Sequence, residues 1–134
     1  MKISIDNKNL SRFNRAFFDA SNKFTYIGSG ELGGKAAGLL LAKEIIDDNF
    51  ENQAFDSIRI NIPNLTVITT SFFDQFMSQN DLYGTAHSDQ SNARIAHAFQ
   101  QAELPMQLVG DLRALIAGVH SPLAIRSSSM LEDA

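Results

Sequence analysis

A glycine-rich turn that leads into a lysine is the first feature of this sequence that could do chemistry. Five glycines fall between residues 28 and 38, and Lys35 stands where the turn meets apolar residues at helical spacing. Glycines let the backbone approach a ligand closely, and the first turn of a helix presents amides whose dipole attracts an anion. A charge-assisted hydrogen bond contributes about 1.5–3 kcal/mol, against about 0.3–1 kcal/mol for the dipole, so the lysine would dominate the attraction for a phosphate.

Two standard phosphate-binding patterns compete for the same turn. A Walker loop would need a glycine at position 29 and a hydroxyl at position 36, where the chain has Ser29 and Ala36. The dinucleotide fingerprint G-x-G-x-x-G is present at residues 28–33, but Asp47 and Asp48, which have the right distance for its ribose-binding acid, fall at a predicted helix end. A dinucleotide-dependent oxidoreductase is therefore the weaker functional alternative. The simplest alternative is that the glycines form a turn that binds no ligand.

A second cluster lies at the end of the sequence. Residues 122–125 form an apolar run, predicted to be a short strand, which ends at Arg126. Serines follow directly, and Glu132 and Asp133 come after them. A guanidinium at a strand end can hold phosphate oxygens with two parallel hydrogen bonds, and neighbouring hydroxyls can add donors. A capped turn with a surface arginine explains this cluster equally well.

The elements that must position these clusters are interleaved helices and strands, so the predicted fold class is α/β or α+β. Thr70 or Ser71 is expected to cap a helix that carries Phe72 to Met77, and Asn80 to Gly84 are expected to form a loop. The other predicted helices cover residues 9–20, 34–48, 91–102 and 105–118, and the other predicted strands cover residues 24–27, 57–63 and 65–69.

Composition restricts the class of protein further. The chain has 134 residues, of which 44% are hydrophobic and 19% charged, as in a globular domain with a core. A net charge of −4 argues against nucleic acid as a partner, and the lack of cysteine fits a reducing compartment. No apolar run approaches the roughly 20 residues that span a bilayer, so we expect no membrane partner and a cytoplasmic location.

Three motifs, taken in order, resemble the start of the nucleotide-binding domain of the phosphoenolpyruvate synthase and pyruvate phosphate dikinase family. The motifs are GGKAAGL (33–39), IPNLTVITTSFF (62–73) and LAIRSSSMLEDA (123–134). The resemblance covers residues 27–134, and residues 1–26 carry no distinguishing feature. It implies a partial ATP-grasp fold, namely the first of two α/β subdomains that close over ATP.

The resemblance also implies a ligand and a set of site residues. Family members move phosphate from ATP, with Mg²⁺, to a histidine on a separate domain and then to pyruvate, which gives phosphoenolpyruvate. The partners implied are ATP and the phosphohistidine and pyruvate-binding domains. The residues expected on the ATP phosphates are Lys35, Arg126, Gly33 and Gly34, with Ser127, Ser128 and Glu132 in support.

Residues 1–134 are expected to form a single incomplete domain, because the family's magnesium and adenosine residues lie further along its sequences. We expect such a fragment to be inactive alone, to contain no catalytic residue or metal site of its own, and to be able to self-associate through uncovered phenylalanines. The alternative is a non-catalytic module that senses a nucleotide or binds a partner. His87, His97 and His120 have no second ligand at suitable spacing and are predicted to be structural.

Overall fold

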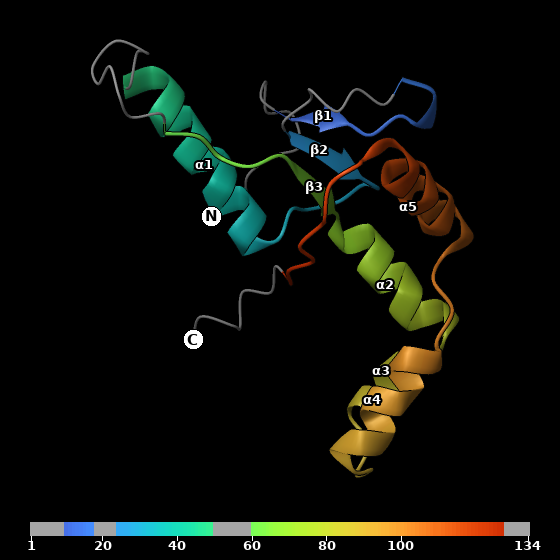
Figure 1. The fold of residues 1–134 in the computed structure, drawn as a ribbon. Coiled ribbons are helices and arrows are strands. Elements are labelled where there is room, and N and C mark those ends of the chain that lie inside the picture. The colour runs from blue at the N-terminus through green and yellow to red at the C-terminus, as the bar shows by residue number, and fades with distance from the viewer. Residues whose placement is uncertain (1–9, 18–23, 50–59, 128–134) are drawn as a thin grey trace.

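The computed structural model describes residues 10–17, 24–49 and 60–127 (Figure 1). Within these residues, three strands and several helices alternate along the chain, which places the described part in the mixed α/β class. The strands are β1 (Ser11–Arg12), β2 (Phe24–Ile27) and β3 (Leu65–Ile68), and the helices are the 3₁₀ turn η1 (Arg15–Phe17), α1 (Gly34–Asn49), α2 (Thr70–Gln79), α3 (Leu82–Ala86), α4 (Asn92–Gln101) and α5 (Met106–Gly118).

The strands form a parallel sheet in the order β1-β2-β3, with β2 in the centre. Side chains alternate along β2, so the sheet supports a core on each face. Phe24 shares one core with Leu40 of α1, whereas Ile27 shares the other with Leu115 of α5. Figure 1 accordingly shows α1 and α5 on opposite sides of the sheet. The buried hydroxyl of Thr25 is paired with that of Thr66, with 2.8 Å between the two oxygens.

The predicted helix over residues 9–20 is wrong for its described part, because residues 11–12 form β1 and residues 15–17 form η1. The Phe13 amide donates to the carbonyl of Tyr26 at 2.8 Å, which extends the pairing with β2. Asn14 Oδ1 then accepts the Ala16 amide at 2.9 Å, a local bond that competes with helix formation. Leu10 and Phe13, three positions apart, would share one face of such a helix, but they belong to the two different cores.

Two further predicted strands are absent from the residues that the structure describes. Residues 60–63 lie outside any strand, and residues 57–59 are not among those described. Residues 122–125 are also irregular, and every residue from 121 to 127 is exposed. An apolar run forms a strand only where it pairs with the edge of a sheet. Within the described chain β3 pairs with β2 alone, so neither of these two runs is paired with β3.

The remaining predicted elements are confirmed within one or two residues. They are the strands at 24–27 and 65–69 and the helices at 34–48, 72–77, 91–102 and 105–118. The predicted loop at Asn80 to Gly84 is wrong in part, because Gly84 lies inside α3. Asn80 itself joins two segments: its side-chain amide donates to the Glu103 carbonyl at 2.9 Å and its Oδ1 accepts the Glu103 amide at 3.0 Å.

The packing of α1 against the sheet predicts that two adjacent leucines contribute very differently to the free energy of unfolding. Leu40 is 0% exposed, whereas Leu41 is 38% exposed on the same helix. Leu40→Ala should lower the free energy of unfolding by about 2–5 kcal/mol, because it leaves a cavity in the core. Leu41→Ala, the control, should lower it by about 1 kcal/mol or less. Urea unfolding measures both, and equal losses would contradict the described burial.

Candidate functional site

The glycine turn joins the end of β2 to the start of α1 and spans residues 28–33. Gly28 has φ of +104° and Gly30 has φ of +91°, so both adopt backbone conformations that side chains disfavour. A Cβ placed on Gly28 would lie 2.4 Å from Thr69 Oγ1 and 2.7 Å from the Phe72 ring. These two glycines are therefore needed because the chain's own residues approach them closely.

A group of three hydroxyl side chains, Thr69, Thr70 and Ser71, holds the glycine turn, and we refer to it as the hydroxyl clamp. The Ser29 amide donates to Ser71 Oγ and the Glu31 amide donates to Thr70 Oγ1, each at 3.0 Å. Backbone bonds run in the opposite direction, with the Thr70 amide donating to the Glu31 carbonyl at 3.1 Å. The turn is thus fixed at both of these positions before any ligand binds.

The hydroxyl clamp corrects one prediction about α2. Thr70 or Ser71 was expected to cap this helix, but its N-cap is Thr69 and no side chain caps it. The Thr69 hydroxyl donates instead to the Ile27 carbonyl at 3.1 Å, so it faces the end of β2. The hydroxyls of Thr70 and Ser71 bond the neighbouring loop instead of capping the helix, because the parallel pairing of β2 with β3 brings the two strand ends together.

Three of the predicted phosphate ligands occupy the start of α1. Gly33 precedes the helix and its carbonyl accepts the Ala37 amide at 3.0 Å, while Gly34 and Lys35 lie in the first turn. No acidic side chain lies in the first turn of the helix itself, and Glu31 is the acidic residue of the turn before it. Lys35 is half-buried. The order of elements is therefore the one that a phosphate site at a helix start requires: a strand, a glycine turn, the start of a helix and a lysine.

The second predicted cluster is only partly described. Arg126 and Ser127 lie in the exposed segment that follows α5, which returns toward the middle of the molecule (Figure 1). Ser128 and Glu132 lie outside the described residues. Arg126 was expected at the end of a strand, and the segment before it is irregular. The described residues thus place Gly33, Gly34 and Lys35 together, and place Arg126 on a separate exposed segment.

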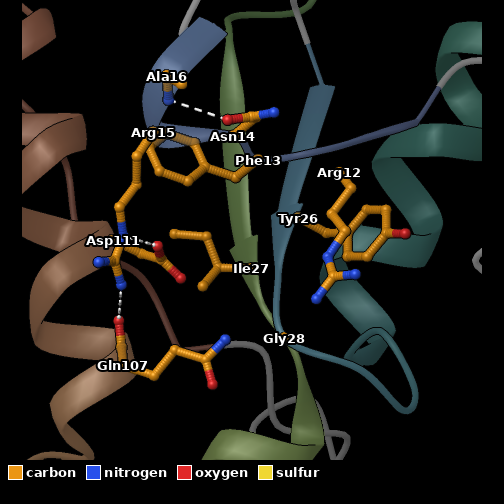
Figure 2. Close-up of a pocket in the computed structure, with 10 residues that line it drawn as sticks. All are labelled: Arg12, Phe13, Asn14, Arg15, Ala16, Tyr26, Ile27, Gly28, Gln107 and Asp111. Carbon is orange, nitrogen blue, oxygen red and sulfur yellow. Dashed lines mark hydrogen bonds and ion pairs between the residues drawn. The ribbon is translucent and has the colours of Figure 1, made fainter.

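The structure adds two features that the sequence interpretation missed. One is the hydroxyl clamp, whose signal in the sequence is a run of three hydroxyl residues directly after a strand. The other is a cavity of about 450 Å³ between β1, the end of β2 and α5, shown in Figure 2. Gly28 lines this cavity, whereas Lys35 and Arg126 do not. The cavity is therefore separate from the predicted phosphate ligands, although it touches the start of the same turn.

Other side chains that could do chemistry lie apart from this region. His87, His97 and His120 are exposed, on or beside three different helices. Among the residues that the structure describes, no group of three histidine, aspartate or glutamate side chains could hold a metal ion. Over the same residues, no helix is both long enough and apolar enough to cross a membrane.

Comparison with known proteins identifies the class of domain. The family model described as "Pyruvate phosphate dikinase, AMP/ATP-binding domain" matches residues 29–134, which include the glycine turn after Gly28, the hydroxyl clamp and Arg126. The chain belongs to this family, and it carries the nucleotide-binding part of a pyruvate phosphate dikinase-like enzyme. Comparisons with curated proteins and with solved structures gave no match.

The strained glycine turn predicts opposite effects for two glycine substitutions. Gly28→Ala should lower the free energy of unfolding by about 1–3 kcal/mol, because it combines a positive φ with a clash against the hydroxyl clamp. Gly38→Ala should raise it by about 0.5–1 kcal/mol, because Gly38 lies inside α1 with no atom within 4 Å of the added Cβ. Thermal or urea unfolding measures both, and a neutral Gly28→Ala would contradict the described turn.

The hydroxyl clamp predicts which amides lose protection when its hydroxyls are removed. In the double variant Thr70→Val with Ser71→Ala, the Ser29 and Glu31 amides should exchange with solvent at least about fivefold faster, because each loses a bond worth about 1 kcal/mol. Ser78→Ala, an exposed serine on the same helix, is the control. Hydrogen exchange followed by NMR gives both rates. Unchanged exchange in the double variant would show that the hydroxyls do not hold the turn.

Proposed function

We propose that this chain binds ATP at the start of α1 and Lys35, as part of an enzyme that transfers a phosphate from ATP to a histidine and then to pyruvate. The observation that carries the proposal is the family match over residues 29–134, combined with a glycine turn that joins a strand to a helix. The whole would be a phosphotransferase of the phosphoenolpyruvate synthase or pyruvate phosphate dikinase type. Residues 1–134 would contribute the first subdomain of its ATP-grasp domain.

The roles proposed for Gly33, Gly34 and Lys35 follow from their charge and position. Gly33 and Gly34 let the backbone at the start of α1 approach a phosphate, and the helix dipole favours an anion there. Lys35 supplies a full charge in the first turn of the same helix. In phosphoryl transfer, catalysis rests on positioning and on stabilising the charge of the transferring group, and Lys35 suits both tasks.

Arg126 is proposed as the second cation on the phosphates, with the hydroxyls of Ser127 and Ser128 beside it. Its segment is exposed and irregular, so its backbone is not tied to the sheet in the residues described. We propose that the segment closes on the triphosphate when ATP binds, because a guanidinium can grip two phosphate oxygens at once. Glu132 is a further proposed supporting residue at the phosphates, and the magnesium ligands would come mostly from elsewhere in the enzyme.

The phosphohistidine domain and the pyruvate-binding domain are the proposed partners of this chain. Large apolar side chains are exposed on the described surface, among them Phe73 at 58%, Ile116 at 62% and Ile125 at 94%. In the absence of a covering domain such side chains favour association between copies, so we propose self-association of residues 1–134 when they are produced alone. We also propose that residues 1–134 alone do not transfer phosphate.

A nucleotide-sensing module without phosphotransfer is the alternative within the same family. A dinucleotide-dependent oxidoreductase is not supported, because Asp47 and Asp48 lie in the last turn of α1, away from the end of β3 at Ile68. The glycines of its fingerprint also have another explanation, since Gly28 and Gly30 are required by the approach of the hydroxyl clamp.

The test is transfer of phosphate to protein in the complete gene product, from ATP that carries the label in both its β- and γ-phosphates. Lys35→Ala and Arg126→Ala should each lower the rate of labelling by about a hundredfold or more, because each removes charge aimed at the transferring phosphate. Lys43→Ala is the matched control, since Lys43 lies two turns further along α1 and is paired with Asp47.

Each outcome of this test has a definite meaning. Equal labelling of both variants and the unsubstituted protein would reject the roles of Lys35 and Arg126. ATP binding without any labelling of the unsubstituted protein would favour the sensing module. A loss of labelling in Lys43→Ala as large as in Lys35→Ala would show that the effect is structural and not local to the phosphates.

A further inference from the structure

The cavity beside the glycine turn lies where a parallel sheet characteristically receives a ligand. β1 ends at Arg12, which pairs with Tyr26, whereas β2 continues through Ile27. The space beyond the end of β1 is thus bounded by Ile27 and Gly28 and closed on the far side by α5. Ligands of open α/β sheets bind outside the carboxyl ends of the strands, and about 450 Å³ suits a small molecule.

One wall of the cavity is fixed by bonds between η1 and α5. Arg15 is ion-paired with Asp111, and its Nη2 donates to the Gln107 carbonyl at 2.8 Å (Figure 2). Gly110 makes room for this arrangement, because a Cβ there would lie 2.5 Å from Arg15 Nη2. The charge of Arg15 is therefore neutralised by its partner, and this arginine closes the wall.

Arg12, the second arginine that lines the cavity, is not held by a bond of this kind to any described residue. Within the described part of the chain, the Arg12 guanidinium takes part in no hydrogen bond or ion pair. Figure 2 shows it next to the Tyr26 ring and turned toward Gly28, on the opposite side of β2 from Arg15. Among the residues that the structure describes, the charged side chains that line the cavity are Arg12, Arg15 and Asp111. Since Arg15 is paired with Asp111, the positive charge that these three leave over is that of Arg12.

We propose that this cavity binds a small organic anion, a carboxylate or a phosphate monoester, with Arg12 as the residue that pairs with the anionic group. The guanidinium offers two parallel donors to such a group. Tyr26, which is partly buried against the core beside α1, and Gln107 of α5 also line the cavity, so the body of the ligand would lie between them. Most of the lining precedes residue 29, so this site lies largely outside the segment matched by the nucleotide-binding family.

The test uses three probes of one size: benzoate, phenyl phosphate and benzamide, which is neutral. Titration of the protein followed by ¹H–¹⁵N NMR should show saturable shifts at the Gly28 amide with at least one of the two anions. Benzamide should bind at least about tenfold more weakly, because it lacks the charge-assisted bond. The comparison of benzoate with phenyl phosphate tells which anionic group the cavity prefers.

Variants assign the binding to Arg12. Arg12→Gln should weaken anion binding about tenfold or more. Arg12→Lys keeps the charge but loses the two parallel N–H donors of the guanidinium, so it should weaken binding less. Arg113→Gln removes an equal charge from an exposed position of α5 that does not line the cavity and should change nothing. Lys35→Ala should also leave the affinity unchanged, which separates this site from the proposed nucleotide site.

Several results would overturn the proposal. They are the absence of saturable binding by both anions, equal binding of benzamide, and unchanged affinity in a folded Arg12→Gln variant. Loss of binding in Lys35→Ala would place the anion at the start of α1 and would equally overturn it. None of these results depends on whether the chain transfers phosphate from ATP.

Discussion

The parallel pairing of β2 with β3 is the constraint on which the rest of the structure depends. It sets the carboxyl ends of the two strands side by side, so the turn after β2 meets the start of α2 although the bonded residues Ser29 and Ser71 are 42 positions apart. Hydroxyls of α2 then hold the amides of the glycine turn, and the turn in turn directs the chain into α1. Positive φ at Gly28 and Gly30 follows from this close approach. The position of Lys35 is therefore set by a sheet and a hydrogen-bond network, and not by the glycines alone.

This arrangement divides the glycines of the turn into two groups with different physical roles. Gly28 and Gly30 make room for Thr69 and Thr70, and they belong to the packing of the chain against itself. Gly33 and Gly34 lie at the start of α1, where we propose that the backbone approaches a phosphate, and both fall within the segment that the AMP/ATP-binding family model matches. A pre-formed turn reduces the loss of conformational entropy when a phosphate binds, which favours affinity. By fixing the glycine turn, the hydroxyl clamp thus favours the phosphate binding that we propose at the start of α1.

The sequence predicted the elements that depend on local pattern and missed those that depend on distant pairing. The helix from Gly34 and the strand at 65–68 follow from apolar spacing and breaker residues, and both are present. The segment around Leu10 and Phe13 has helical spacing, yet pairing with β2 makes it extended and sends the two side chains to opposite faces. The same reasoning applies to residues 122–125, where an apolar run finds no strand partner among the described residues. Lys35 was predicted as a phosphate ligand from its neighbours in the sequence, and this stays a prediction. The cavity beside Arg12 could not be predicted, because it is assembled from β1, β2 and α5.

The most direct test of the account is a crystal structure of the complete gene product with a non-hydrolysable ATP analogue. We expect the triphosphate to lie at the start of α1, with phosphate oxygens within hydrogen-bond distance of Lys35 Nζ and of the first-turn amides. We also expect Arg126 to reach the same phosphates from the segment after α5. A triphosphate bound away from the start of α1, with Lys35 in contact only with protein, would contradict the central claim.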